Sequence, residues 1–399
     1  MKKRLVYLCG LFLMSVCSCT NTTTKVDFID DNLQFAEKQI SASVTGCSSE
    51  DKVTSPRTTL PDGSIKYAVP EDWTSGFFPG SLWLLYDYSG EEKWKNEADR
   101  FTRSIEEVKD LKWHHDVGFM INCSYGNAYR LTKNEYYKDV MIQAANSLIT
   151  RYSPAVGCTK SWNVDRGWQA ERGWSYPVII DNMMNLELLF NATEFTGDST
   201  YYDIAIAHAN TTLENHFRDD YSCYHVIDYD SITGEVRHKH TAQGYAHESA
   251  WARGQAWAIY GYTMCYRFTK DPAYLKQAEN IAAFLLNNKN WPADNVPYWD
   301  FNDPKIPNTY RDASAGSIIA SALIELSTYA NDGASYKAAA VKMLKSLGSP
   351  AYRAKLGENN NFVLMHSVGS IPHGAEIDVP LNYADYYFIE ALLRLKALK

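Results

Sequence analysis

Cysteine is scarce in the body of this 399-residue chain. Beyond the first twenty residues only Cys47, Cys123, Cys158, Cys223 and Cys265 remain, and no two of them stand in CxxC spacing. An odd number of cysteines at scattered positions predicts neither a disulfide framework nor a zinc site, although one incidental bridge is possible.

Other motifs of site chemistry are missing as well. The chain has no HExxH or DxDxDG sequence, and because His114 and His115 are adjacent we do not expect both to face one ligand position. It also lacks the Gly-rich phosphate signatures and the GxSxG nucleophile elbow. The sequence therefore predicts no bound metal and no organic cofactor.

The chain has no long basic run, and its formal net charge is -8. This charge balance argues against non-specific binding to nucleic acid. Aromatic residues are abundant instead, with 28 Tyr and 11 Trp. They can fill a core, and where they cluster with glycine they also suit stacking against sugar rings.

The first nineteen residues have the features of a secretion signal. A positive start is followed by the apolar residues 5–16, which are too few to span a membrane, and then by Val16-Cys17-Ser18-Cys19, which resembles the bacterial lipobox. We expect a lipoprotein signal peptide over residues 1–19 that ends at lipidated Cys19, with Cys17 as the alternative, and a linker over residues 20–25. The lipid would tether an extracytoplasmic protein to the membrane on the periplasmic side, whereas ordinary cleavage would release it.

Six times along the chain, a cluster of aromatic, glycine and charged residues leads into an almost uninterrupted apolar helix. These segments are residues 73–90, 113–132, 174–197, 251–269, 310–331 and 378–398. More amphipathic helices are expected at residues 26–44, 91–109, 135–151, 201–217, 272–288 and 335–347. Residues 318–324 are apolar around the whole helix circumference, as a helix covered on all sides must be.

A helix pair repeated six times predicts a closed all-α (α/α)6 barrel, the six-hairpin toroid, as a single catalytic domain over residues 26–399. We prefer it to an open solenoid because no atypical capping repeat is visible. The polar clusters all fall at the same end of the inner helices, so the binding site is expected there. The long connections 153–173, 219–249 and 291–308 are expected to be loops of functional length.

Two carboxylates stand out by position. Asp116 comes immediately before the second inner helix, and Asp181 is a lone charge at the start of the third. Either could be only a helix cap. However, Asp181 lies between Ile179-Ile180 and Met183-Met184, and apolar neighbours raise the pKa of a carboxyl toward that of a proton donor. Adjacent inner helices are expected to place both carboxylates across one cavity, as in sugar-cleaving enzymes.

The fourth inner segment combines Trp251 and Trp257 with Arg253, a planar cation suited to a carboxylate. His225 could orient a water or a carboxyl group, or could be a structural hydrogen-bonding residue. A cation beside aromatic side chains in an acidic protein suggests an anionic sugar as the ligand.

Further candidates lie outside this segment. Trp73 and Trp162 could be sugar platforms or packing residues of the rim. Arg311 and Asp312 are expected to pair with one another in the floor of the cavity.

These motifs resemble those of the unsaturated glucuronyl hydrolases, glycoside hydrolase family 88. The resemblance rests on residues 73–88, 115–119, 178–189, 222–229, 241–261, 296–301, 311–326 and 385–395, which occur in the family's order. It implies the (α/α)6 barrel independently of the helix count. It also implies a substrate class: oligosaccharides that polysaccharide lyases leave with a 4,5-unsaturated uronic acid at the non-reducing end.

The resemblance also implies a mechanism, in which the C4–C5 double bond is hydrated. Asp181 matches the family's proton donor to C4, and Asp116 matches the second essential carboxylate. The positions that match residues lining the family's site are His115, His225, Thr241, Gln243, Trp251, Arg253 and Trp257. Residues 367–373 lie where family members vary, so the preference for the second sugar and for sulfate stays open.

Two alternatives accompany this prediction. One is a lipid-anchored glycan-binding protein without turnover, since aromatic platforms and a lipid anchor suit it equally well. The other is an unsaturated rhamnogalacturonyl hydrolase on the same barrel. The sequence predicts an unsaturated oligosaccharide as partner and contact with the membrane only through the anchor, and it does not indicate the oligomeric state.

Overall fold

The computed structural model describes Met1, residues 27–49 and residues 52–399. The predicted signal peptide after Met1, the lipidation candidates Cys17 and Cys19, and the predicted linker 20–25 lie outside the described residues. None of the described helices combines the length and the apolar composition needed to cross a membrane.

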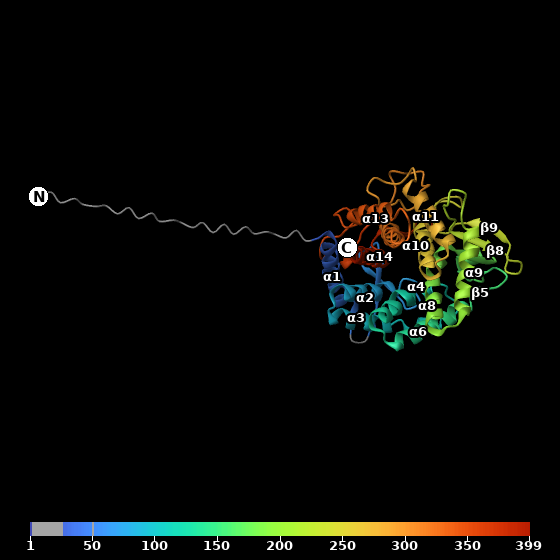
Figure 1. The fold of residues 1–399 in the computed structure, drawn as a ribbon, viewed down its shortest axis with the longest axis horizontal. Coiled ribbons are helices and arrows are strands. Elements are labelled where there is room, and N and C mark those ends of the chain that lie inside the picture. The colour runs from blue at the N-terminus through green and yellow to red at the C-terminus, as the bar shows by residue number, and fades with distance from the viewer. Residues whose placement is uncertain (2–26, 50–51) are drawn as a thin grey trace.

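Six outer helices alternate along the described chain with six inner helical segments, and together they form a ring (Figure 1). The outer helices are α1 (Phe28–Cys47), α3 (Glu92–Arg103), α6 (Glu135–Ile149), α9 (Ser199–Asn215), α11 (Pro272–Leu286) and α13 (Gly333–Leu347). The inner segments are α2 (Phe77–Ser89), α4 with α5 (Val117–Ile121, Asn127–Thr132), η3 with α8 (Ile180–Asn185, Leu186–Thr196), α10 (Ala252–Thr269), α12 (Ala313–Leu326) and α14 (Asn382–Ala397). The predicted (α/α)6 barrel is confirmed.

Burial explains the difference between the two sets of helices. Every residue of α12 from Ala313 to Ile324 is buried, because this helix contacts α10, α13 and α14. The outer helices bury one face, and several begin with a side-chain cap: Asn134, Asp198 and Asp271 each accept a hydrogen bond from the second residue of the helix that follows. Local sequence thus fixes where these helices start.

Contacts between chain segments far apart in sequence close the ring. The last inner helix, α14, packs against the first, α2, and against the first outer helix, α1. One hydrophobic core runs through the barrel from Ile29 to Leu395. Within the described part of the chain, the cysteines at 123, 158, 223 and 265 are buried free thiols, so no bridge joins any of these four.

Two predicted inner helices are less regular than expected. The second is interrupted by a π-helical stretch, Asn122–Gly126, between α4 and α5. The third begins with strand β7 (Tyr176–Ile179) and the 3-10 helix η3 before α8 continues it. Asp181 therefore lies in a 3-10 turn and not in the first turn of an α-helix.

The prediction of loops is wrong for part of the long connections. Strands β8 (Val226–Tyr229) and β9 (Val236–His240) lie within residues 219–249 and form an antiparallel sheet with β7. All four residues of β8 are buried, so both faces of this central strand are covered. Its sequence is too short to distinguish a strand from a loop by periodicity alone.

Hairpins collect at the N-terminal ends of the inner helices. In one hairpin, β3 (Ser55–Thr59) pairs with β4 (Ile65–Ala68), and Thr58 bridges to Leu381, which directly precedes α14. In the other, β10 (Ser367–Ser370) pairs with β11 (Ala375–Val379), and the carbonyl of His366 accepts a hydrogen bond from the first residue of α12. This end of the barrel is therefore walled by irregular segments, which is the arrangement that a binding site requires.

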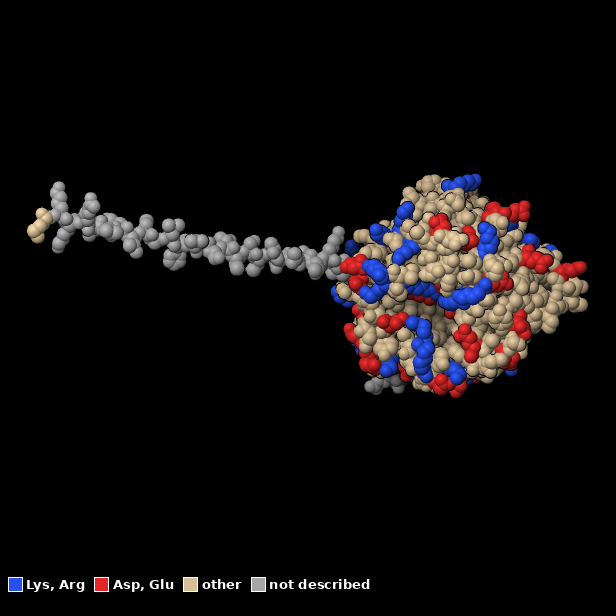
Figure 2. Space-filling model, viewed as in Figure 1, with Lys and Arg blue, Asp and Glu red and all other residues tan. Residues whose placement is uncertain are grey.

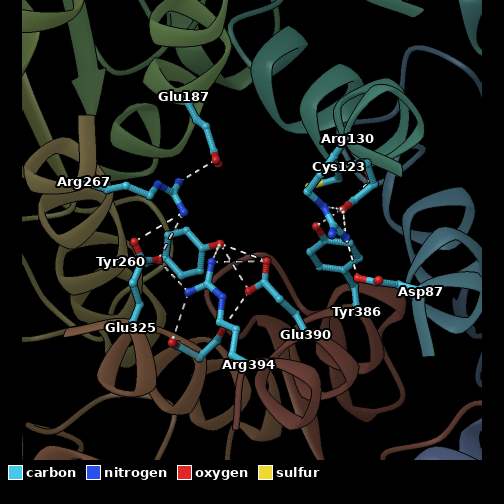
Figure 3. Close-up of polar contacts among 12 residues, drawn as sticks. Asp87, Cys123, Arg130, Glu187, Tyr260, Arg267, Glu325, Tyr386, Glu390 and Arg394 are labelled. Carbon is cyan, nitrogen blue, oxygen red and sulfur yellow. Dashed lines mark hydrogen bonds and ion pairs between the residues drawn. The ribbon is translucent and has the colours of Figure 1, made fainter. Parts of the chain in front are cut away.

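The opposite end of the barrel carries a chain of ion pairs, shown in Figure 3. Arg267 lies 2.5 Å from Glu187 and 3.3 Å from Glu325, and Arg394 lies 2.8 Å from Glu325 and 3.5 Å from Glu390. These residues come from α8, α10, α12 and α14. The pairs join the C-terminal halves of α10, α12 and α14 to Glu187 in the first turn of α8.

Candidate active site

Two cavities of similar size lie at the two ends of the inner helices, about 480 Å³ at the N-terminal end and about 500 Å³ at the C-terminal end. Figure 2 shows a hollow at the centre of one face with basic and acidic side chains around it. At the C-terminal end, the charged groups of Figure 3 neutralise one another. In the wall of the N-terminal cavity, Nε2 of His115 and the hydroxyl of Tyr383 are buried and have no hydrogen-bond partner among the described residues. The same holds behind this wall for Asp181 Oδ2, His225 Nε2 and Trp257 Nε1. Unpaired buried polar atoms are costly, so this cavity is the one built for a ligand.

Asp116 stands at the N-terminus of α4 but does not cap it, since its side chain accepts no hydrogen bond from that helix. Its Oδ1 accepts a hydrogen bond from Asn185 (3.2 Å), and its Oδ2 lies 3.1 Å from Nε2 of His115. Burial alone would raise the pKa of Asp116, but the interactions with His115 and Asn185 outweigh burial and lower it. This carboxyl is therefore the ionised member of the pair.

The pKa of Asp181 is shifted in the opposite direction. It is buried in the 3-10 turn between Ile180 and Met183. Burial, together with the negative charge of Asp116, raises the pKa of Asp181 to about 7, and Arg253 offsets only part of that rise. The predicted upward shift is confirmed, and the two carboxyls interact as one pair. Below about pH 7 such a pair holds one proton on Asp181 and a charge on Asp116.

The hydrogen bonds of His225 define its tautomer. Its Nδ1 accepts hydrogen bonds from the backbone N–H groups of Ala242 (3.1 Å) and Gln243 (3.2 Å), so the proton is on Nε2. Burial lowers the pKa of His225 well below its ordinary value, so the ring is neutral. The Nε2 atom lies 3.8 Å from Oδ2 of Asp181. His225 thus presents a fixed N–H donor beside the acid.

Arg253 lines the cavity, but its guanidinium is already engaged. It pairs with Asp312 (3.2 Å) and donates to the carbonyls of Val368 and Gly369, the latter at 2.6 Å. It therefore ties the β10 backbone to α10 and brings a positive charge close to the cavity. A role in binding a substrate carboxylate stays a prediction.

The expected pair of Arg311 with Asp312 is wrong. Asp312 caps α12 and pairs with Arg253, whereas Arg311 lies 3.1 Å from Asp294. The two residues stand in extended backbone, where Arg311 forms a bridge to Tyr298. Successive side chains of extended backbone point to opposite sides, so neighbours do not face each other.

The expectation that the adjacent histidines do not face one position is also wrong. The rings of His114 and His115 are stacked with centroids 5.4 Å apart, and polar atoms of both histidines and Asp116 lie within 4.8 Å of one another. Nδ1 of His114 accepts the backbone N–H of Asp116 at 3.0 Å. Both histidines therefore contact Asp116, one at its backbone and one at its carboxylate.

The predicted binding residues divide into two groups. Trp73, His115, Trp162, Gln243 and Arg253 line the cavity together with Asp116.

The remaining predicted residues, Asp181 and His225 among them, are not part of the cavity lining and lie behind this wall, so of the two carboxylates expected to face the cavity only Asp116 lines it. Trp251 packs against His225 with ring centroids 4.6 Å apart, and Trp257 packs against Phe119 at 5.1 Å. The hydroxyl of Thr241 accepts the backbone N–H of Gly244 at 2.8 Å. These three residues support the residues that line the cavity.

Several contacts of the site were not predicted from the sequence. Asn185, His114 and Asp312 each fix one predicted residue in place. At the cavity opening, Trp168 of α7 (Gly167–Ala170) approaches His373 of the β10–β11 turn, with ring centroids 5.1 Å apart. A short polar side chain beside an apolar run carries no local signal of its distant partner, so only the fold reveals these contacts.

Cleavage of sugars by acid–base chemistry requires one carboxyl that holds a proton and one that does not. The fold and this carboxyl pair together define a glycoside hydrolase. A model of Glycosyl Hydrolase Family 88 matches residues 51–391, and the chain belongs to this family.

Known proteins agree with this assignment over most of their length. An unsaturated glucuronyl hydrolase of Formosa agariphila is 50% identical over 345 residues, which cover 86% of this chain and 85% of that protein. An unsaturated chondroitin disaccharide hydrolase of Streptococcus pyogenes is 35% identical and covers 82% of this chain and 83% of its own. The crystal structure of an unsaturated glucuronyl hydrolase specific for heparin matches with a TM-score of 0.89 at 45% identity, over 93% of this chain and 98% of that chain.

Proposed function

We propose that this enzyme releases a 4,5-unsaturated uronic acid from the non-reducing end of oligosaccharides that a polysaccharide lyase has produced, with glycosaminoglycan fragments as the main source. The observation that carries the proposal is the carboxyl pair, in which burial and the charge of Asp116 raise the pKa of Asp181 to about 7. Family membership supports the same reaction class.

In the proposed reaction, Asp181 donates its proton to C4 of the unsaturated ring, and water adds at C5. Asp181, now ionised, takes a proton from that water and so returns to its starting state. Asp116 stays ionised and raises the proton affinity of Asp181 throughout. The hemiketal formed at C5 then opens and releases the remaining sugar.

The other residues of the site bind and orient the substrate and the water. Trp73 and Trp162 line the cavity and offer ring faces for the sugar. The Nε2–H of His225 lies beside Asp181 and suits a water or a uronate oxygen. Arg253 supplies positive charge next to the site of an anionic ring.

The kind of glycosaminoglycan is a finer question. The relatives include a chondroitin disaccharide hydrolase and an enzyme specific for heparin, and one solved neighbour is complexed with dGlcA-GalNAc6S. In this chain the second sugar would meet the β10–β11 turn with Ser370 and His373. Initial rates on lyase-generated disaccharides from chondroitin, hyaluronan, heparin and pectin would rank the substrates, and a preference for the pectin product would instead favour an unsaturated rhamnogalacturonyl hydrolase.

One variant, Asp181→Asn, should lose turnover and keep substrate binding. Asp181→Asn should abolish the loss of ultraviolet absorbance of the unsaturated uronate, while calorimetry should still show disaccharide binding. Asp385→Asn is the matched control, because Asp385 is also buried and burial also raises its pKa to about 7, yet it bonds to Val363 and Leu364 and not to the cavity. Full activity in Asp181→Asn would overturn the proposed role. A binding protein without turnover, the alternative that the comparisons do not favour, has no need of a desolvated acid.

We further propose that residues 1–19 are a lipoprotein signal peptide and that Cys19 carries the lipid. The enzyme would then be tethered in the bacterial periplasm, where small oligosaccharides produced by lyases would reach it. The lipobox-like sequence Val16-Cys17-Ser18-Cys19 supports this location.

A further inference from the structure

Asn185 connects the segment that carries Asp181 to the carboxyl group of Asp116. It is the last residue of η3, four positions after Asp181, and is 1% exposed. Its Nδ2 donates to Oδ1 of Asp116 (3.2 Å), and its Oδ1 accepts the backbone N–H of Phe119 (2.8 Å). One side chain thus joins the segment that carries Asp181 to the helix that begins after Asp116.

The hydrogen bond from the N–H of Phe119 to Asn185 takes the place of an ordinary helix cap. The N–H of Phe119 belongs to the first turn of α4, where backbone donors have no partner within the helix. Asp116 stands in the capping position but does not use its side chain for capping, since Asn185 supplies the acceptor. The Asp116 carboxylate is therefore not used as a cap and lines the cavity.

The close approach depends on a glycine. A Cβ at Gly118 would lie 2.5 Å from Oδ1 and from Cα of Asn185, which no side chain can occupy without displacing the η3 backbone. Gly118 therefore allows α4 and η3 to meet at the distance that both hydrogen bonds of Asn185 require.

We propose that Asn185 is a positioning residue that keeps Asp116 ionised and turned toward Asp181, so that the shared proton of the pair stays on Asp181. The inference rests on the proposed function, because it concerns the same reaction. An amide N–H can only donate, so it favours the charged form of the oxygen that it contacts. Nε2 of His115 lies 3.1 Å from the other oxygen, so Asn185 supplies the hydrogen bond and His115 a second polar neighbour.

The charged and titratable groups around Asp116 come from several elements. His114 and His115 precede it, Asp181 lies on η3, and Arg151 follows α6. Arg151 is engaged by the carbonyls of Lys112, Lys160 and Ser161. Asn185 is the neutral donor in this set, so its removal changes the hydrogen bonding of Asp116 without removing a charge.

The test is the pH dependence of kcat for wild type, Asn185→Asp and Asn185→Ala on an unsaturated disaccharide. Asn185→Asp preserves volume and the acceptor for Phe119, but when ionised it cannot donate and it repels Asp116. Activity requires an ionised Asp116. The acidic limb of the kcat profile of Asn185→Asp should therefore lie about one pH unit above that of wild type. The kcat should fall about tenfold or more with a smaller change in KM, since the interaction acts on the reacting state.

Asn191→Ala is the matched control. Asn191 also joins the third inner segment to the second, through a 2.9 Å bond to Asn122, but lies toward the opposite end of α8. A purely structural contribution of Asn185 would give the same result as this control, namely a lower melting temperature with an unchanged acidic limb, and would overturn the proposal.

A second measurement does not depend on turnover. The ¹³C carboxyl signal of Asp116, assigned by its loss in Asp116→Asn, should titrate at higher pH in Asn185→Asp than in wild type. An unchanged titration overturns the inference even if activity falls. If wild type hydrolyses none of the disaccharides, the proposed function fails, and the carboxyl titration still decides the role of Asn185.

Discussion

The Nε2 atom of His225 lies 3.8 Å from Oδ2 of Asp181. This separation is too long for a direct hydrogen bond, yet both atoms can contact one oxygen that lies to the side of the line between them. Neither atom has a partner among the described residues. The pair is therefore a ready site for a water or a sugar oxygen next to the acid.

This geometry predicts different effects for two replacements of His225. Glutamine can place an N–H near the Nε2 position, whereas asparagine can only replace the Nδ1 acceptor for Ala242 and Gln243. We expect His225→Asn to lower kcat by about 10²-fold, within the range for loss of a positioned donor, and His225→Gln to lower it less. Steady-state kinetics with equal melting temperatures would check this order, and the reverse order would contradict it.

The carboxyl pair predicts a bell-shaped dependence of kcat on pH. Activity should fall above about pH 7, as Asp181 loses its proton, because burial and Asp116 raise its pKa to about that value. It should also fall in acid as Asp116, whose pKa lies below its ordinary value, takes up a proton. Stopped assays across pH 3–9 would measure both limbs, and a flat profile to pH 9 would contradict the assignment of Asp181.

The same acid should reduce stability. The folded pKa of Asp181, about 7, exceeds the ordinary value of 3.8, so the folded state holds the proton more tightly. Stability is then unaffected below pH 4 and is lost as the pH rises through 7, by on the order of 4 kcal/mol. Asp181→Asn should therefore raise the melting temperature at pH 8 and change it little at pH 4, as differential scanning fluorimetry would show.

The ion pairs at the C-terminal end of the barrel should stabilise the fold without serving the reaction. Glu325 is shared by Arg267 and Arg394 (Figure 3), and its replacement leaves two half-buried cations short of a partner. Glu325→Gln should cost about 3 kcal/mol in the free energy of unfolding and leave kcat of the folded enzyme unchanged.

The control for this prediction is Glu194→Gln. Glu194 is an exposed carboxylate that lines the same cavity, so its replacement should have little effect on urea unfolding. An equal loss of unfolding free energy in Glu325→Gln and Glu194→Gln would show that the shared ion pairs contribute nothing specific to stability.

The proposed anchor predicts lipid attachment at one cysteine. Cys19→Ala should abolish incorporation of labelled palmitate and release the enzyme into the soluble fraction, whereas Cys17→Ala should retain both the label and the membrane fraction. Accessibility to protease in intact cells would then show which face of the membrane carries the enzyme. Labelling that depends on Cys17 would move the cleavage site by two residues.

The candidate site shows how far a sequence can indicate chemistry. The apolar neighbours of Asp181 predicted its raised pKa, because desolvation there arises from residues adjacent in the chain. The neighbours of Asp116 did not reveal that it leaves its own helix uncapped, since the acceptor comes from Asn185, 69 positions away. Asp312 likewise pairs with the distant Arg253 and not with its neighbour Arg311, as the sequence had suggested.

The sequence by itself determined the repeated helix pairs, their caps and the end of the barrel where polar residues collect. Each of these follows from periodicity and from hydrogen bonds between residues a few positions apart. Only the tertiary structure decided which cavity leaves polar atoms unpaired, where β7, β8 and β9 form a sheet, and how Asn185 links the segment of Asp181 to Asp116. Those features depend on contacts between distant segments, which exist only once the ring of helices has closed.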